Sequence, residues 1–234
     1  MIQRVLILSI LIGITSCSSS IEGEGPATAQ NETAVEQFNE VEIDCNCDVT
    51  LIPSESAHVV VESHQNLIDN YEIVFNRGTL KLSEKSHVSK FNLYNVNVYF
   101  NSDIKKIKLK NKTRLKVSGT LKSDNLDLEL KDQSEITQSF LEIKEFQIKA
   151  SDHSKVQLNG TVIDLKVKAM DKSNVNLSNL QAVSVDLTTE DDSELLLNVL
   201  KNIKGTAGDN SKVFYKGDPV KDIKEIDRAS IQQN

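Results

Sequence analysis

The sequence has no tryptophan, and only four tyrosines and seven phenylalanines among its 234 residues. Ligand grooves usually supply aromatic side chains, so this scarcity gives little support to a carbohydrate-active enzyme. Three prolines and nine glycines exclude a collagen-like chain, and 38% apolar residues argue against disorder. Three cysteines are too few for a fold stapled by disulfides. We therefore expect a folded protein with a hydrophobic core.

An excess of basic residues is also missing. Lys and Arg total 27 against 34 Asp and Glu, which gives a net charge of −7 and a pI near 5.2. Binding to a phosphate backbone needs a basic face, so we expect no nucleic-acid partner. No phosphate loop, dinucleotide fingerprint or Ser-His-Asp arrangement is present. We expect no cofactor and assign no catalytic residue.

Long apolar runs are absent apart from the N-terminus. The run from Val5 to Ile14 follows Arg4 and has the length of a signal-peptide core, about ten residues, whereas a membrane span needs roughly 20. It ends in Ile14-Thr15-Ser16-Cys17, which resembles the lipobox of bacterial lipoproteins. We predict a signal peptide over residues 1–16 and lipidation of Cys17. The alternative is an ordinary secretory signal with a chance cysteine.

The predicted lipid anchor sets the expected location. Two acyl chains suffice for stable membrane attachment without a transmembrane helix. The polar composition after Cys17 predicts a flexible tether over residues 17–34. Ser18 does not resemble an inner-membrane retention signal, and Glu22 and Glu24 lie where surface-export signals are acidic. We expect an outer-membrane lipoprotein of the cell envelope, facing either the periplasm or the outside.

The other two cysteines lie in Asp44-Cys45-Asn46-Cys47-Asp48. In a strand, residues i and i+2 have Cα atoms roughly 6.5–7 Å apart, so a disulfide there needs a bend. Two buried thiols, a strained disulfide and half of a metal site are all open, and we favour the buried thiols. No second cysteine pair exists and the four histidines show no ligand spacing, so no metal site is predicted.

An internal repeat begins at residue 105. Alternating apolar residues followed by a three-residue polar turn return six times, at intervals of 18 to 21 residues. Each turn closes with Ser or Thr. Alternation at period 2 predicts short strands on either side of a corner. The predicted turns begin at Asn111, Asp132, Asp152, Asp171, Asp191 and Asp209.

A unit of about 20 residues cannot enclose a core, so the units should stack, each adding a strand about 4.8 Å from the last. We predict an all-β fold: a right-handed parallel β-solenoid of about six coils over residues 105–219, capped by a partly antiparallel β-rich segment over residues 35–104. A polar tail over residues 220–234 follows Pro219, which we expect to stop further pairing. Apolar residues of the linking arms are expected to point inward: Leu121, Leu141, Val162, Leu180 and Leu200.

The stacked aspartates allow two interpretations. Asp or Asn at the first turn position can bond to the backbone two residues on, and a column of carboxylates can also chelate a divalent cation. Calcium-binding solenoid turns are rich in glycine, and these turns have none. We therefore favour turn chemistry over cation binding.

Several short motifs resemble one family. They are Phe38-Asn39-Glu40-Val41, Asp48-Val49-Thr50-Leu51, Asn66-Leu67-Ile68, Gly78-Thr79-Leu80-Lys81-Leu82 and Tyr215-Lys216-Gly217-Asp218-Pro219. With the lipobox and six repeats, they look like the auto-transporter adhesin (head-GIN domain) family, which is common in envelope proteins of Bacteroidetes. The resemblance covers residues 38–219 and implies a β-helix in the cell envelope with no established activity. Asp-x-Ser replaces the family's Ser-Gly-rich turns, so the chain is a divergent member.

These features predict a lipid-anchored, non-enzymatic module for binding, adhesion or scaffolding. Its expected partners are the membrane, through Cys17, and a protein or glycan surface. The alternatives are a polysaccharide lyase or hydrolase and a purely structural envelope protein. The paired carboxylates of Asp191 and Asp192 fall on a turn, and acidic faces repel a polyanionic glycan, so an enzyme is disfavoured.

Overall fold

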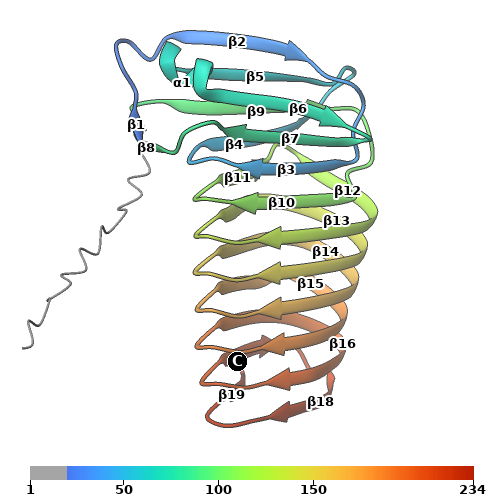
Figure 1. Ribbon diagram of the computed structural model, residues 1–234. Helices are drawn as coiled ribbons and strands as arrows, with labels where there is room; N and C mark the ends of the chain where they lie inside the picture. The colour runs from blue at the N-terminus through green and yellow to red at the C-terminus, as the bar shows by residue number, and fades with distance from the viewer. Residues whose placement is uncertain (1–19) are drawn as a thin grey trace, which may run out of the picture.

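The computed structural model describes residues 20–234, so the predicted signal peptide and Cys17 lie outside the described residues. The chain forms a column of stacked coils with a cap at its N-terminal end (Figure 1). It is nearly all β, with one short helix, α1 (Gln65–Asn70), in the described range. Within that range, no helix has both the length and the apolar character needed to cross a membrane.

The lower part of the column is a parallel β-solenoid of about six turns, as predicted. Each strand pairs in parallel with the equivalent strand one coil later; Leu128, for example, lies beside Ile148, and Ile148 lies beside Val167. The strands are β10 (Lys106–Lys110), β11 (Arg114–Val117), β12 (Thr120–Leu130), β13 (Glu135–Ala150), β14 (Lys155–Ala169), β15 (Asn174–Thr189), β16 (Glu194–Ala207), β17 (Lys212–Lys216), β18 (Val220–Glu225) and β19 (Ser230–Gln233).

Inward-facing apolar side chains form one continuous core from Phe38 in the cap to Tyr215 near the far end, so residues 20–234 fold as one unit. Four of the five linking-arm residues are buried as expected. Leu200 is not: its side chain is 46% exposed, and Val199 takes the inward position. The reason is local, because three successive residues of β16 face outward from Leu200 onward.

Every predicted turn residue lies at a corner of the stack. There, two successive residues adopt left-handed φ values between 49° and 64°. The amide of the third residue donates to the carbonyl before the turn, as from Ser134 to Lys131 at 3.1 Å. This is a type I′ turn, in which Asp and Asn are tolerated at positive φ. The expected bond from the aspartate side chain to the backbone is not formed at these turns in residues 20–234, so conformational tolerance explains the Asp column.

The corners are also bonded to one another. In the first five turns, the amide of the second turn residue donates to the carbonyl of the first turn residue in the next coil, as from Gln133 to Asp152 at 2.9 Å. The buried Ser or Thr that closes a turn bonds to the preceding coil at every predicted turn except the one closed by Ser154. Ser173 Oγ donates to Ala150 O at 3.1 Å, and Ser193 Oγ donates to Ala169 O at 2.9 Å. Each corner is therefore held by the coils on both sides.

The cap continues the stack before folding over its end. Strand β3 pairs in parallel with β10, and β4 pairs with β11. Antiparallel pairs β2–β5, β5–β9 and β6–β7 then cover the open edge, which is otherwise a site of aggregation. The cap strands are β1 (Ile21–Glu22), β2 (Ala29–Ala34), β3 (Glu40–Asp44), β4 (Asp48–Pro53), β5 (His58–Ser63), β6 (Tyr71–Asn76), β7 (Thr79–Glu84), β8 (Val88–Lys90) and β9 (Tyr94–Phe100).

The prediction of a flexible tether over residues 17–34 is wrong for residues 21–34. Strand β1 pairs with β8, and β2 pairs with β5. The Asn66 side chain donates to Glu22 O at 2.7 Å and accepts from Glu24 N at 3.0 Å, and the buried His64 ring bonds Gly25 O at 2.9 Å. The polar composition of this segment predicts a tether because it offers little apolar surface to bury. The segment is ordered instead by its hydrogen bonds to the cap.

The prediction of a polar tail over residues 220–234 is also wrong. Strand β18 pairs in parallel with β16, and β19 pairs with β17, so these residues form a last coil of the solenoid. Pro219 directly precedes β18 and does not stop the pairing. At the start of a strand, the amide that proline lacks is not needed by the ladder.

The serine column offers a matched test of the corner bonds. Ser173→Ala removes a buried hydroxyl that donates to the preceding coil, so we expect the free energy of unfolding to fall by about 1 kcal/mol. Ser154→Ala removes the equivalent hydroxyl, which is buried without a hydrogen-bond partner, so stability should stay level or rise. Urea unfolding of residues 20–234 measures both. Equal losses for the two variants would contradict this account of the corner.

Candidate functional site

The long strands bend where successive residues face outward. In β13, Lys144 and Glu145 are both exposed between the buried Ile143 and Phe146. A regular strand alternates its side chains, so two outward residues in a row change its direction. The same break recurs at Val183-Ser184 in β15. Because the coils are in register, the bends lie one above another.

A groove of about 730 Å³ follows these bends along the coils from β12 to β18. Its floor is formed by buried apolar residues: Leu126, Phe146, Leu165, Val185 and Ile203. The first rim is formed by the residues before the floor: Asn125, Glu145, Asp164, Ser184, Asn202 and Val220. The second rim is formed by the residues after the floor: Asp127, Gln147, Lys166, Asp186, Lys204 and Asp222.

The groove is acidic and rich in hydrogen-bond acceptors. Five of its rim residues are carboxylates and two are lysines. Lys204 Nζ lies 3.6 Å from Asp186 Oδ2, in an exposed pair that solvent screens. Glu145 and Asp164, on neighbouring coils of the first rim, have no ion-pair partner within residues 20–234. An extended ligand lying here meets a polar side chain from each rim at nearly every coil.

The aspartate column lies at a different corner. The structure stacks Asp132, Asp152, Asp171, Asp191 and Asp209 there, with Asn111 at the first turn. Across the described residues, no group of three or more His, Cys, Asp or Glu side chains is arranged to hold a metal ion. The column therefore aligns carboxylates along one edge without converging them on a point. Cys17, the other predicted site residue, lies outside the described residues.

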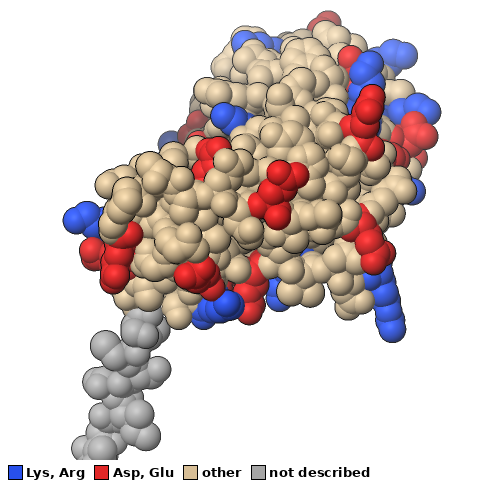
Figure 2. All heavy atoms as spheres, turned by 90° about the horizontal axis from the view of Figure 1, so that it is seen from above, with Lys and Arg blue, Asp and Glu red and all other residues tan. Residues whose placement is uncertain are grey.

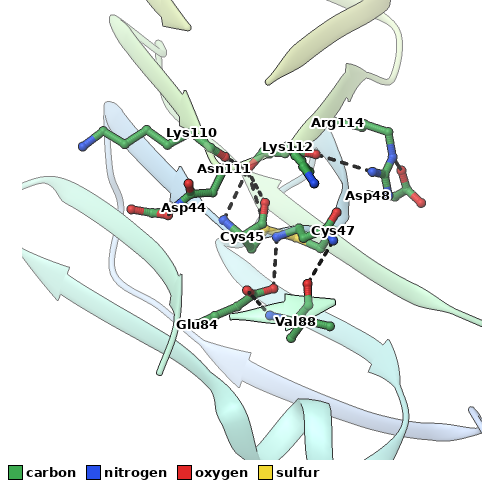
Figure 3. The surroundings of a disulfide bond; sticks show 12 residues. Asp44, Cys45, Cys47, Asp48, Glu84, Val88, Lys110, Asn111, Lys112 and Arg114 are labelled. Atoms are coloured by element: carbon green, nitrogen blue, oxygen red, sulfur yellow. Dashed lines mark hydrogen bonds and ion pairs between the residues drawn. A yellow bond between two sulfur atoms is a disulfide. The ribbon is translucent and has the colours of Figure 1, made fainter. Parts of the chain in front are cut away.

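Cys45 and Cys47 form a disulfide with their Cα atoms 5.4 Å apart (Figure 3). The sequence left three interpretations open, and the favoured one, two buried thiols, is wrong. The pair occupies the corner above Asn111-Lys112-Thr113, since the strands on either side are in register. The corner supplies the bend that brings the two Cα atoms within reach. Thr113 Oγ1 donates to Cys45 O at 2.8 Å, which ties this corner to the next.

Glu84 covers the disulfide corner from the cap side (Figure 3). Its two carboxylate oxygens accept from the amides of Asn46 at 3.0 Å and Val88 at 3.1 Å. Burial raises the pKa of the Glu84 carboxyl above its ordinary value, against the opposing effect of these two bonds. The nearby Tyr71 and Tyr94 hydroxyls are buried without hydrogen-bond partners, and burial raises the pKa of both. We assign this cluster to cap stability, because it belongs to the closed interior.

The cap end carries no patch of one charge. Viewed along the column from the cap, acidic and basic side chains are intermixed, and most of the surface between them is uncharged (Figure 2). This face therefore offers no basic surface to a polyanion.

The comparisons with known proteins agree with this geometry. The family model described as "Putative auto-transporter adhesin, head GIN domain" matches residues 37–219. The chain belongs to this family. No curated relative matches it.

Solved structures share the fold of this head-GIN chain at low identity. A "putative adhesin" from Bacteroides fragilis has a TM-score of 0.84 at 18% identity, covering 92% of this chain and 100% of its own. A "putative adhesin" from Parabacteroides merdae has a TM-score of 0.77 at 16% identity, covering 92% and 99%. A "Putative lipid binding protein" from Parabacteroides distasonis has a TM-score of 0.77 at 14% identity, covering 92% and 100%.

The groove was missed by sequence reasoning. Its signal is the break in alternation, where two polar residues such as Lys144 and Glu145 separate inward apolar ones. Aligning that break in every repeat places the rim residues in columns. The sequence alone does not give the register in which the long strands of successive coils align. Without that register, the rim residues cannot be distinguished from other outward-facing residues of these strands.

The raised pKa of Glu84 predicts a pH dependence. A carboxyl with a folded pKa above its unfolded value contributes stability that is complete below the unfolded pKa and is lost as pH rises through the folded pKa. Glu84→Gln does not ionise. We therefore expect the unfolding free energy of the wild type, minus that of Glu84→Gln, to decrease between pH 4 and pH 8. Urea unfolding across this range measures the difference, and an increase with pH would contradict the assignment.

Proposed function

We propose that this head-GIN protein is a non-enzymatic binding module that holds an extended, uncharged or positively charged glycan in the groove. The observation that carries the proposal is the repetition of hydrogen-bonding side chains on both rims, about every 4.8 Å along the stack. Carboxylate and amide oxygens accept bonds from hydroxyl and ammonium groups. The surplus of carboxylates disfavours a polyanionic chain.

The form of the groove supports binding over catalysis. A catalytic site converges a nucleophile, an acid or base and a charge-stabilising group on one reacting atom. The rims instead distribute their polar groups in line, such as Glu145 and Asp164 on successive coils. The adhesin names of the structural relatives agree with binding. An acyl chain fits poorly, because the floor residues Leu126, Phe146 and Leu165 are each only 2% exposed.

We further propose that the protein is a lipoprotein of the outer membrane, anchored at Cys17. The lipobox supports the anchor, and the Cys45–Cys47 disulfide supports an oxidising compartment such as the periplasm or cell surface. Strand β1 begins at Ile21, and four residues span at most about 14 Å. The cap would then lie close to the membrane, and the solenoid would project its groove away from it.

Paired variants test the groove. Glu145→Gln with Asp164→Asn removes two carboxylates from the first rim, and Asp171→Asn with Asp191→Asn removes two from the turn column, where Asn is equally tolerated. Losing charged hydrogen bonds costs about 1.5–3 kcal/mol each, so we expect the groove variant to bind an aminated polysaccharide at least roughly tenfold more weakly. The turn variant should bind as the wild type does. Immobilised neutral, cationic and anionic polysaccharides provide the assay.

Two results would oppose the groove proposal. Equal losses in both variants would mean that the groove is not the site. Release of reducing ends from any of these polysaccharides would show that the protein is instead a glycan-cleaving enzyme.

A separate experiment tests the anchor. Cys17→Ser removes the thiol that the acyl chain needs, so we expect complete loss of palmitate labelling and release of the protein from the membrane fraction. The disulfide variant Cys45→Ala with Cys47→Ala is the control and should remain labelled. Continued labelling of Cys17→Ser would contradict the proposed lipidation.

A further inference from the structure

The far end of the solenoid is an uncovered strand edge. Strand β18 pairs with β16 on one side, and β19 pairs with β17, so no register among the described strands occupies the other side of β18. This edge lies at the opposite end of the column from the cap (Figure 1). An open parallel stack offers unpaired amides and carbonyls to any strand that fits them.

The side chains of β18 are unusual for a coil of this stack. Lys221 lies beneath Ile203, and Glu225 lies beneath Ala207, so two charges occupy columns that are apolar in the coil before. Ile223 lies between them in the same inward-facing row. Neither charge has an ion-pair partner elsewhere in residues 20–234. Both charged side chains are exposed to solvent in the single chain, so they carry no burial cost there. A second chain that covers this edge has to supply an opposite charge to each of them, because a buried unpaired charge is costly.

The sequence of this edge is complementary to itself when two copies run antiparallel. With Ile223 opposite Ile223 of a second copy, Lys221 faces Glu225 and Asp222 faces Lys224, each pair opposite in charge. The same register places Val220 against Ile226, which are 73% and 37% exposed and are among the most exposed large apolar side chains described. Directly opposed residues lie on the same face of an antiparallel pair, so the inward charges meet inward charges.

The backbone is compatible with this register. The Ile226 amide donates to Ala207 O at 2.8 Å, so it points toward β16. Backbone groups alternate between the two edges of a strand, which directs those of Lys221, Ile223 and Glu225 to the free edge. In the proposed register these three residues face one another across the two-fold axis, where their amides and carbonyls can pair.

From this complementarity we propose that the protein forms an end-to-end dimer, in which β18 pairs antiparallel with β18 of a second copy around Ile223. The contact is isologous, so it closes at two copies and does not propagate into a fibre. The two caps lie at opposite ends of such a dimer. If the anchor at Cys17 proposed above holds, the dimer suits the joining of two membranes that face each other; the dimer itself does not depend on that anchor.

Charge reversal tests the pairing. Lys221→Glu places Glu opposite Glu in both symmetric pairs, and Glu225→Lys places Lys opposite Lys. Within one chain these two residues are four positions apart on a strand, too far to contact each other. A one-to-one mixture of the two variants restores both opposite-charge pairs in a heterodimer. Lys149→Glu makes the same charge change at an exposed position of β13 and serves as the control.

Sedimentation equilibrium of residues 20–234 over a range of concentrations measures the dimer. We expect the wild type and Lys149→Glu to dimerise, each single β18 variant to weaken dimerisation at least tenfold, and the mixture to recover it. Recovery also shows that both variants are folded. A wild type that stays monomeric at every concentration, a Lys221→Glu variant that dimerises as the wild type does, or a mixture that fails to recover would each overturn the proposal. If the wild type stays monomeric, the charges of Lys221 and Glu225 would serve to keep the edge unpaired.

Discussion

The architecture depends on a corner that can be stacked. Each coil reverses direction through two left-handed residues, and the amide of the second bonds to the carbonyl of the corresponding corner in the next coil. The closing Ser or Thr is buried, and at five of the six predicted turns its hydroxyl bonds to the coil before. A turn with hydrogen bonds only among its own residues would leave these backbone groups unpaired at the edge of the core. Because the corners bond along the stack, the strands between them remain in register over about six turns.

Register then determines what the surface can do. Once every coil is aligned, a local irregularity repeated in the sequence becomes a continuous feature of the molecule. The double outward residue in each arm becomes a groove with two polar rims, whereas the turn aspartates become a column at another corner. The groove has about 730 Å³ and gathers its polar side chains around an apolar floor, whereas the hollow along the turn column has about 440 Å³ and is lined by polar turn residues alone. This difference in size and lining is why we assign binding to the groove.

The two ends of the stack protect their open strand edges from unspecific pairing in different ways. At the N-terminal end, the cap covers the stack with antiparallel strands, and the Cys45–Cys47 disulfide replaces the left-handed turn at the first corner. At the far end, β18 remains open and carries charges in inward-facing positions. A charged edge resists unspecific pairing, and its palindromic order of charges admits one specific partner.

Much of the solenoid was predictable, because alternation and the Asp-x-Ser period are visible in the residues themselves. The positions of Asp132 and Asp171 at the turns followed from the same pattern. The ordered conformation of residues 21–34 was not predictable, since it depends on hydrogen bonds from Asn66 and His64 to a polar segment. The last coil was missed because Pro219 precedes a strand instead of interrupting one. The groove required the register of the bends, and the disulfide required the corner at Asn46, neither of which the spacing of residues reveals.

The most direct test of the corner is residue-resolved hydrogen exchange of residues 20–234, followed by NMR. The amides of Gln133, His153 and Lys172 lie in surface turns, yet each donates to the next coil at 2.9 to 3.0 Å. The account predicts that these turn amides exchange as slowly as those of the neighbouring strands. Exchange at the rate of an unstructured chain, with the strands still protected, would show that the corners do not hold the stack together.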